Sequence, residues 1–164
     1  MRRAISRGAA AALVSIVLCG LSFDAVAQPT TRPFKGSFDG QFTEFHEVDG
    51  VLTATLTASH NSTHMGRGPV SGQLRVNGDG TVGGTITVTA ADGSAFVMTM
   101  SGNIHFEEGD DSGSAVFTLV GTINSGTGRF EGISGALTVE GVSADLPEPE
   151  LFSFGGHWSG TTTY

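Results

Sequence analysis

Residues 63–68 (THMGRG) place a histidine and an arginine three positions apart. The imidazole of His64 titrates near neutral pH, and the guanidinium of Arg67 is suited to pairing with a carboxylate. Near the mouth of a binding cavity, the two could bind a carboxylate or polarise a carbonyl group. The alternative is an ordinary polar connection, in which His64 meets backbone groups and Arg67 pairs with a neighbouring acid. Polar residues are common in loops for this second reason.

No other combination of residues predicts a reaction. A zinc site needs three or four converging ligands, and the five histidines do not offer such a set. We therefore expect solvated surface histidines, no metal ligand and no cofactor. The one cysteine is Cys19, and the chain has no Gly-x-Ser-x-Gly elbow, so we assign no catalytic residue.

A glycine-rich stretch at residues 126–132 (GTGRFEG) superficially resembles a loop that cradles phosphate. It lacks the following helix and the Gly-Lys-Ser/Thr ending that would hold the anion. A structural role is the better interpretation. We expect Phe130 to anchor the core, with Arg129 and Glu131 on the opposite face and the glycines allowing a bulge.

The elements that position these loops are strands. Apolar side chains such as Leu52, Ala54 and Leu56 alternate with threonines, and period two is the strand period. Eight strands are expected, at residues 34–46, 51–60, 69–77, 81–90, 94–106, 114–123, 128–142 and 151–164. The chain is therefore all-β. Short connections with Asp-Gly and Asn-Gly pairs favour an eight-stranded antiparallel up-and-down barrel, and a two-sheet β-sandwich is the alternative.

Aromatic residues gather on the apolar face of the first and last strands. These strands must pair when a barrel closes, so their aromatic side chains would lie side by side. The predicted ligand-binding residues are Phe38, Phe42, Phe152, Phe154 and Trp158, together with His64 and Arg67. An eight-stranded barrel is just wide enough for side chains or one small ligand. Small inward residues leave room for a small apolar molecule, unless the aromatic rings fill that room themselves.

The first 27 residues have the pattern of a secretory signal peptide. Arg2, Arg3 and Arg7 precede an apolar stretch of about 13 residues, short of the ~20 that span a bilayer, and an Ala-Val-Ala cleavage site ends at Ala27. We expect residues 28–33 to form a flexible leader and residues 34–164 a single β-barrel domain. The predicted destination is secreted or periplasmic.

The charge of the chain limits its partners. The formal net charge is −8, and loss of the signal peptide removes three arginines but one acid, Asp24. Such an acidic protein is a poor partner for nucleic acid or an anionic membrane surface. No stable membrane insertion is expected after processing. The mature chain would also lack cysteine and hence disulfides, so burial and sheet hydrogen bonds must stabilise it.

Residues 63–68 and 121–135 (GTINSGTGRFEGISG) carry a resemblance to a known family. They resemble the small secreted bacterial β-barrel proteins related in fold to allene oxide cyclase and the dirigent proteins. The resemblance implies an eight-stranded antiparallel barrel with an apolar cavity, often in a homo-oligomer. Allene oxide cyclases steer a reactive fatty-acid epoxide, and dirigent proteins orient phenoxy radicals. Their polar pocket residues do not align with this chain, so no catalytic residue is transferred.

The sequence favours a non-enzymatic, exported barrel that binds a small apolar ligand or is simply structural. One alternative is a cyclase- or isomerase-like barrel enzyme acting on a small apolar substrate. Such an enzyme needs at least one titratable group that points inward with a shifted pKa. Another alternative is an outer-membrane β-barrel, which would place its apolar side chains outward.

Overall fold

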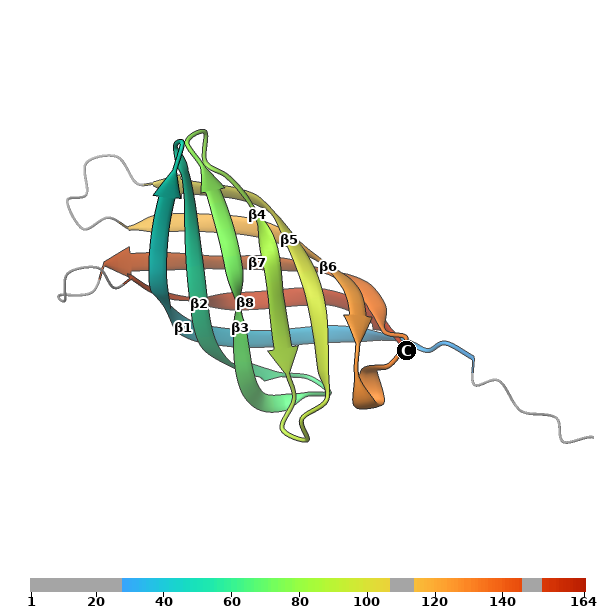
Figure 1. Ribbon diagram of the computed structural model, residues 1–164. Helices are drawn as coiled ribbons and strands as arrows, with labels where there is room; N and C mark the ends of the chain where they lie inside the picture. The colour runs from blue at the N-terminus through green and yellow to red at the C-terminus, as the bar shows by residue number, and fades with distance from the viewer. Residues whose placement is uncertain (1–27, 107–113, 146–151) are drawn as a thin grey trace, which may run out of the picture.

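The computed structural model describes residues 28–106, 114–145 and 152–164. Its strands, shown in Figure 1, are β1 (Thr31–Val48), β2 (Val51–Ser62), β3 (Gly66–Asn77), β4 (Thr81–Thr89), β5 (Ala95–Phe106), β6 (Ala115–Gly126), β7 (Ser134–Asp145) and β8 (Phe152–Thr163). One short 3-10 turn, η1 (Gly128–Phe130), lies between β6 and β7. None of the helical segments in the described ranges is long and apolar enough to cross a membrane. The expected signal peptide lies outside the described residues.

The strands form a closed barrel in which each one pairs antiparallel with the next. Closure is made by β1, which pairs with β2 and also with β8. Gly36 sits at the centre of this junction, opposite Ser62 on one side and Trp158 on the other. The prediction of an eight-stranded up-and-down barrel is confirmed, and the sandwich alternative is not observed.

Several strand boundaries differ from the expected ones, and the starts of β1 and β7 change the local structure. β1 begins at Thr31, so part of the expected leader pairs with β8 through a 2.8 Å hydrogen bond between the hydroxyls of Thr31 and Thr163. The seventh strand was expected from residue 128 but begins at Ser134. The intervening chain turns at Gly128 and Gly132, whose φ angles of 61° and 77° favour glycine over other residues. The turn packs Phe130 into the core, as predicted.

Apolar and polar side chains separate onto the two faces of the barrel as the alternation predicts. On β6, for example, Phe117, Leu119 and Ile123 are buried, and the intervening residues are exposed. A bulge in β1 interrupts the alternation, because Phe42 pairs with Leu56 but Glu44 pairs with Thr55. The extra residue is Thr43, and it turns Phe45 onto the inner face beside Phe42.

Inward glycines allow neighbouring strands to approach closely. A Cβ at Gly156 would lie 2.7 Å from the Cα of Gly141 and 2.9 Å from the ring of Phe38, and it would also overlap the carbonyl oxygen of Glu140. At the adjacent Gly155 a Cβ would meet its nearest neighbour, the carbonyl oxygen of Phe38, at an ordinary 3.5 Å. The strand therefore requires glycine on its inner face only.

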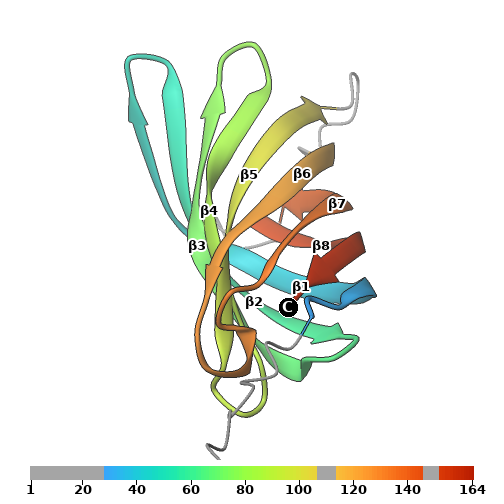
Figure 2. The ribbon, with the colours of Figure 1, turned by 90° about the vertical axis from the view of Figure 1, so that its right-hand side faces the viewer.

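The connections fall at two ends of the barrel. The β1–β2 and β3–β4 hairpins project together at one end, and Figure 2 shows them at the top. The β2–β3 and β4–β5 turns lie at the opposite end with η1. We call the first end the mouth and the second the closed end. Residues 107–113 and 146–151, which connect β5 to β6 and β7 to β8, lie outside the described residues.

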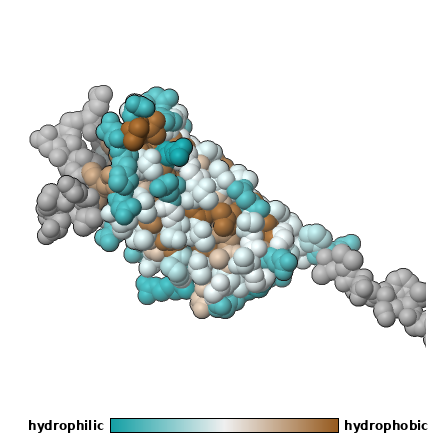
Figure 3. Space-filling model, viewed as in Figure 1, coloured by the Kyte–Doolittle hydropathy of each residue, from teal (hydrophilic) through white to brown (hydrophobic). Residues whose placement is uncertain are grey.

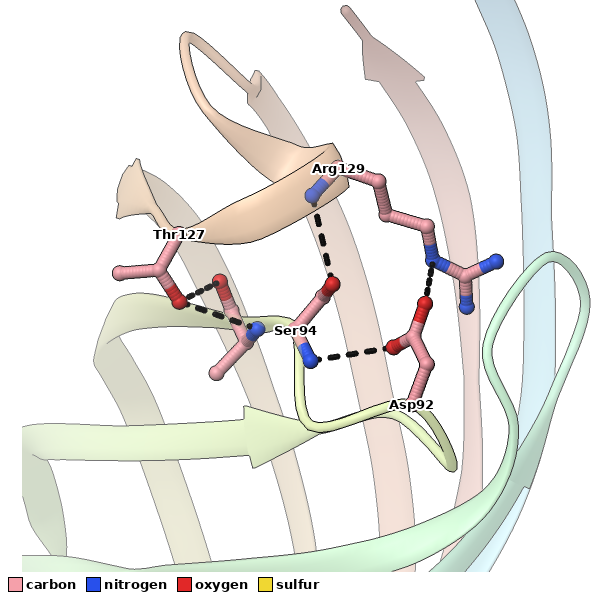
Figure 4. Close-up of polar contacts among 5 residues, drawn as sticks. Asp92, Ser94, Thr127 and Arg129 are labelled. Atoms are coloured by element: carbon pink, nitrogen blue, oxygen red, sulfur yellow. Dashed lines mark hydrogen bonds and ion pairs between the residues drawn. The ribbon is translucent and has the colours of Figure 1, made fainter.

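At the closed end, the turn before β5 is fastened to η1 (Figure 4). Arg129 Nε lies 3.1 Å from a carboxylate oxygen of Asp92, and the other oxygen of Asp92 accepts a hydrogen bond from the backbone N–H of Ser94. The hydroxyl oxygen of Ser94 in turn accepts a hydrogen bond from the backbone N–H of Arg129. Thr127 completes the link by donating its backbone N–H to the carbonyl of Ala95 at 2.8 Å. Residues 126–132 thus have structural contacts here, in line with the structural role that the sequence favoured over a phosphate loop.

The two adjacent glycines of β8 give a matched test of this packing. Gly156→Ala should lower the free energy of unfolding by about 1–3 kcal/mol, because its methyl group overpacks the inner face. Gly155→Ala should change it by less than about 0.5 kcal/mol, since its methyl group finds room. Urea unfolding of both variants measures the difference. Equal destabilisation of the two would show that close strand approach does not constrain this position.

Candidate functional site

An apolar cavity of about 140 Å³ lies inside the barrel, toward the mouth. Its walls come from all eight strands. The residues that line it are Phe38, Phe42, Phe45, Leu52, Ala54, Leu56, Ala58, Val70, Leu74, Val76, Val82, Ile86, Met100, Ile104, Phe106, Phe117, Leu119, Val139, Ser143, Phe152, Phe154 and Trp158. The polar side-chain groups among these lining residues are the hydroxyl of Ser143 and the indole N–H of Trp158. Such a wall suits an apolar occupant.

Five of the seven residues expected to bind a ligand lie in this wall: Phe38, Phe42, Phe152, Phe154 and Trp158. The pairing of β1 with β8 brings them together. The ring centroids of Phe38 and Trp158 are 5.1 Å apart, and those of Phe42 and Phe154 are 4.7 Å apart. These distances are typical of favourable aromatic pairs. The structure thus groups these side chains, and ligand binding by them remains a prediction.

The cavity ends where aromatic rings fill the barrel toward the closed end. The ring centroid of Phe34 lies 6.2 Å from that of Trp158 and 5.9 Å from that of Phe96. Phe130 continues this series, with its ring centroid 6.0 Å from that of Phe96 and 5.7 Å from that of Tyr164. Trp158 therefore forms the floor of the cavity and the top of a packed aromatic core.

At the mouth, the cavity reaches the surface. Phe106 is a lining residue and is nevertheless 64% exposed, and Val48 at the tip of the β1–β2 hairpin is 67% exposed. Phe45 and Phe152 are half-buried, with ring centroids 5.3 Å apart. Figure 3 shows hydrophobic atoms exposed among hydrophilic ones at the hairpin tips. A small molecule could enter here without disturbing the sheet.

A buried polar chain lies behind Trp158. The indole N–H of Trp158 donates to the hydroxyl oxygen of Ser62 at 2.9 Å, and that hydroxyl lies 3.0 Å from Nδ1 of His60. Nε2 of His60 lies 2.8 Å from the carbonyl oxygen of Thr89. A carbonyl can only accept, so Nε2 carries the proton, Nδ1 accepts, and Ser62 donates to it. Every polar group in this hydrogen-bonded series has a partner when the imidazole is neutral.

For His60 the expectation of a solvated surface histidine is wrong, because its side chain is 1% exposed. Burial lowers its pKa below the ordinary 6.5, and the hydrogen bond to Thr89 opposes that shift. The alternation of β2 contained the signal, since His60 shares a face with Leu56 and Ala58. The Ser62–His60 pair has the composition of a nucleophile and its base, but it is not in the cavity wall. Its hydroxyl is committed to Trp158 and His60, as in a structural network.

His64 and Arg67 do not join the aromatic group. Both are exposed and lie at the closed end, where the β2–β3 turn brings Nε2 of His64 to 3.2 Å from the carbonyl oxygen of Pro33. The expectation that they share a site with the aromatic residues is not met. Connections in an up-and-down barrel alternate between its ends, so this turn lies opposite the mouth. In the described ranges, moreover, no three His, Cys, Asp or Glu side chains converge as metal ligands.

Comparison with known proteins supports the fold and no more. No family model matches the sequence, and no curated protein matches it. A crystal structure of a protein of unknown function from Clostridium acetobutylicum ATCC 824 is similar, with a TM-score of 0.52 and 10% sequence identity. The match covers 80% of this chain and 99% of that one. At this identity the likeness concerns the barrel alone, and the resemblance to the allene oxide cyclase and dirigent barrels remains a hypothesis.

The depressed pKa of His60 predicts a pH dependence of stability. Below about pH 6.5 the unfolded chain protonates this histidine while the folded chain does not, so acidification should favour unfolding. Urea unfolding between pH 7 and pH 5 should therefore show falling stability. His60→Gln should lessen this slope, whereas His105→Gln on the outer face should leave it in place. An unchanged slope in His60→Gln would contradict the assignment.

Proposed function

We propose that this chain is an exported barrel that binds a small apolar molecule in its cavity. The observation that carries the proposal is the cavity of about 140 Å³ with an apolar wall, open at the mouth beside Phe106. Protein interiors normally contain few voids larger than a water molecule. An apolar void of this size inside the barrel lowers stability, and binding gives it a use.

The size of the cavity limits the ligand. An apolar cavity of about 150 Å³ stays dry and accepts a molecule such as benzene. The cavity here is of the same order, so a single ring or a short alkyl chain matches it. Each buried methylene contributes about 0.8 kcal/mol, so a six-carbon ligand gains about 5 kcal/mol, which corresponds to roughly millimolar binding.

Binding is a better interpretation than catalysis because of the chemistry of the wall. A cyclase or isomerase needs an acid, a base or an oxyanion donor in contact with the substrate. Among the described residues that line the cavity, Ser143 supplies the one hydroxyl, and none supplies a carboxylate or an imidazole. The inward titratable residue His60 is separated from the cavity by Trp158. A titratable group on the wall would favour the enzyme, and none of the described lining residues provides one.

The distribution of side chains also opposes an outer-membrane barrel. Such a barrel faces lipid with a continuous apolar band and has a polar interior. Here the apolar residues line the interior, while the outer faces of β2 and β6 carry mainly threonine, serine and asparagine. The exposed valines of β6 and β7, Val116, Val120 and Val142, are too few to form a band.

Export is the second part of the proposal, and it predicts the mature N-terminus. Signal peptidase should cleave after Ala27, because the small residues of the Ala-Val-Ala motif fit its specificity. N-terminal sequencing of protein recovered from the periplasm or medium of an expressing bacterium should begin at or near Gln28. Intact Arg2 and Arg3 in the mature product would contradict export through this site.

Binding can be measured through Trp158, which is the one tryptophan of the chain and forms the floor of the cavity. Titration with toluene should change its emission and saturate. Ala54→Leu, which adds three carbons to the cavity wall, should weaken toluene binding at least about tenfold by occupying the same space. Native mass spectrometry of protein from its own host should reveal co-purified small molecules.

The matched control is Ala136→Leu, which makes the same change on the exposed outer face of β7. It should bind toluene as the unmodified protein does. If Trp158 emission responds to no apolar probe and no adduct is detected, the cavity is not a binding site and the proposal fails.

A further inference from the structure

The mouth of the cavity carries an inward-facing acid. After the bulge at Thr43, the inner register of β1 runs through Phe45 to Glu47, and Glu47 pairs with Leu52. Leu52 and Phe45 both line the cavity, so Glu47 stands on the same face, one step closer to the surface. Its side chain is exposed and open to an incoming ligand. Glu47 is thus a charged residue at the mouth on the inner register of β1.

The remaining described charges reinforce this polarity. Glu44, Asp49 and Asp79 also lie at the mouth. Among the described residues, Arg75 is the single lysine or arginine at this end. It lies on the outer register between Leu74 and Val76, which both face the cavity. The other described cations gather toward the closed end: Arg32, Lys35, Arg67 and Arg129. The field at the mouth is therefore negative, and it is concentrated beside an apolar entrance.

From this arrangement we infer that the ligand is a hydrophobic amine, with an apolar body in the cavity and an ammonium group at the mouth. The inference rests on the proposed binding function and adds the charge of the ligand. Glu47 would pair with the ammonium group, and the rings of Phe45 and Phe152 offer faces to which a cation is attracted. The ammonium group would remain partly hydrated, so its desolvation cost is small.

The same arrangement disfavours the opposite charge. A fatty acid or phenolate in the cavity would bring its anionic group beside Glu47. None of the described lining residues is cationic, so the wall provides no counter-charge there. Like charges at this distance repel, and an entering anion would also meet the negative field of the mouth. Neutral apolar molecules should bind with intermediate affinity.

Three probes of one shape and different charge test the inference. Hexylamine, hexanol and hexanoate are titrated at pH 7 and low salt, with Trp158 emission and calorimetry as readouts. Hexylamine should bind about threefold to tenfold more tightly than hexanol, as expected for one exposed ion pair and a cation–π contact. Hexanoate should bind most weakly. Raising the ionic strength to about 0.5 M should reduce the advantage of hexylamine, because exposed charges are screened.

Glu47→Gln should reduce the advantage of hexylamine by about twofold to fivefold and leave hexanol binding unchanged. Glu131→Gln, which removes an exposed carboxylate at the closed end, should keep the original preference. Equal binding of hexylamine and hexanol, or preference for hexanoate, would overturn the inference while leaving the binding function intact. Failure of all three probes to bind would instead overturn the proposed function.

Discussion

The structure depends on one constraint: β1 must pair with β2 and β8 at the same time. In an open sheet the first and last strands each keep one unpaired edge, so pairing β1 with β8 requires the strands to coil and the inner faces to converge. At Gly36, which lies between Ser62 and Trp158, an added Cβ would overlap the side chains of both partners. The hydrogen-bonded closure and the inward glycines are therefore consequences of the same geometry.

This geometry divides the interior into two parts. Toward the closed end, Phe34, Phe96 and Phe130 are at most 2% exposed and fill the space that the glycines leave. Toward the mouth, the rings of Phe42, Phe45 and Phe152 lie in the wall and leave the cavity between them and the other strands. Trp158 marks the boundary, with its ring in the cavity wall and its N–H tied to the buried chain of Ser62 and His60. Trp158 thus separates the apolar cavity on one side from the hydrogen-bonded Ser62 and His60 on the other.

Much of this could be predicted from the sequence, because period-two alternation and turn residues act locally. Asp49 and Gly50 illustrate this point: both have positive φ, as the Asp-Gly pair predicts for a hairpin turn. The aromatic grouping of Phe38 with Phe154 followed from closure of the barrel. The position of His64 at the end opposite the mouth also follows from the alternation of connections, because successive turns of an up-and-down barrel lie at opposite ends.

Other features arise only when the whole barrel is assembled. The volume of the cavity depends on how side chains from all eight strands meet, which no single segment encodes. The alternation of β2 predicts an inward position for His60. It does not predict the contacts of His60 with Thr89 and Trp158, because these residues are distant in sequence. The seventh strand began later than expected because two glycines with positive φ redirect a segment whose alternation alone resembles a strand.

The bulge at Thr43 has a consequence for how this barrel can change over evolutionary time. On the closed-end side of the bulge, β1 pairs with both β2 and β8. On the mouth side, the β1–β2 hairpin is anchored mainly by the pairing of β2 with β3. If the bulge were lost and Thr43 itself paired with Thr55, the two faces of β1 at the hairpin tip would exchange, so that Glu44 and His46 would replace Phe45 and Glu47 at the entrance. Gain or loss of the bulge at this single position thus allows a lineage to revise the chemistry of the entrance while the packed half of the barrel stays the same.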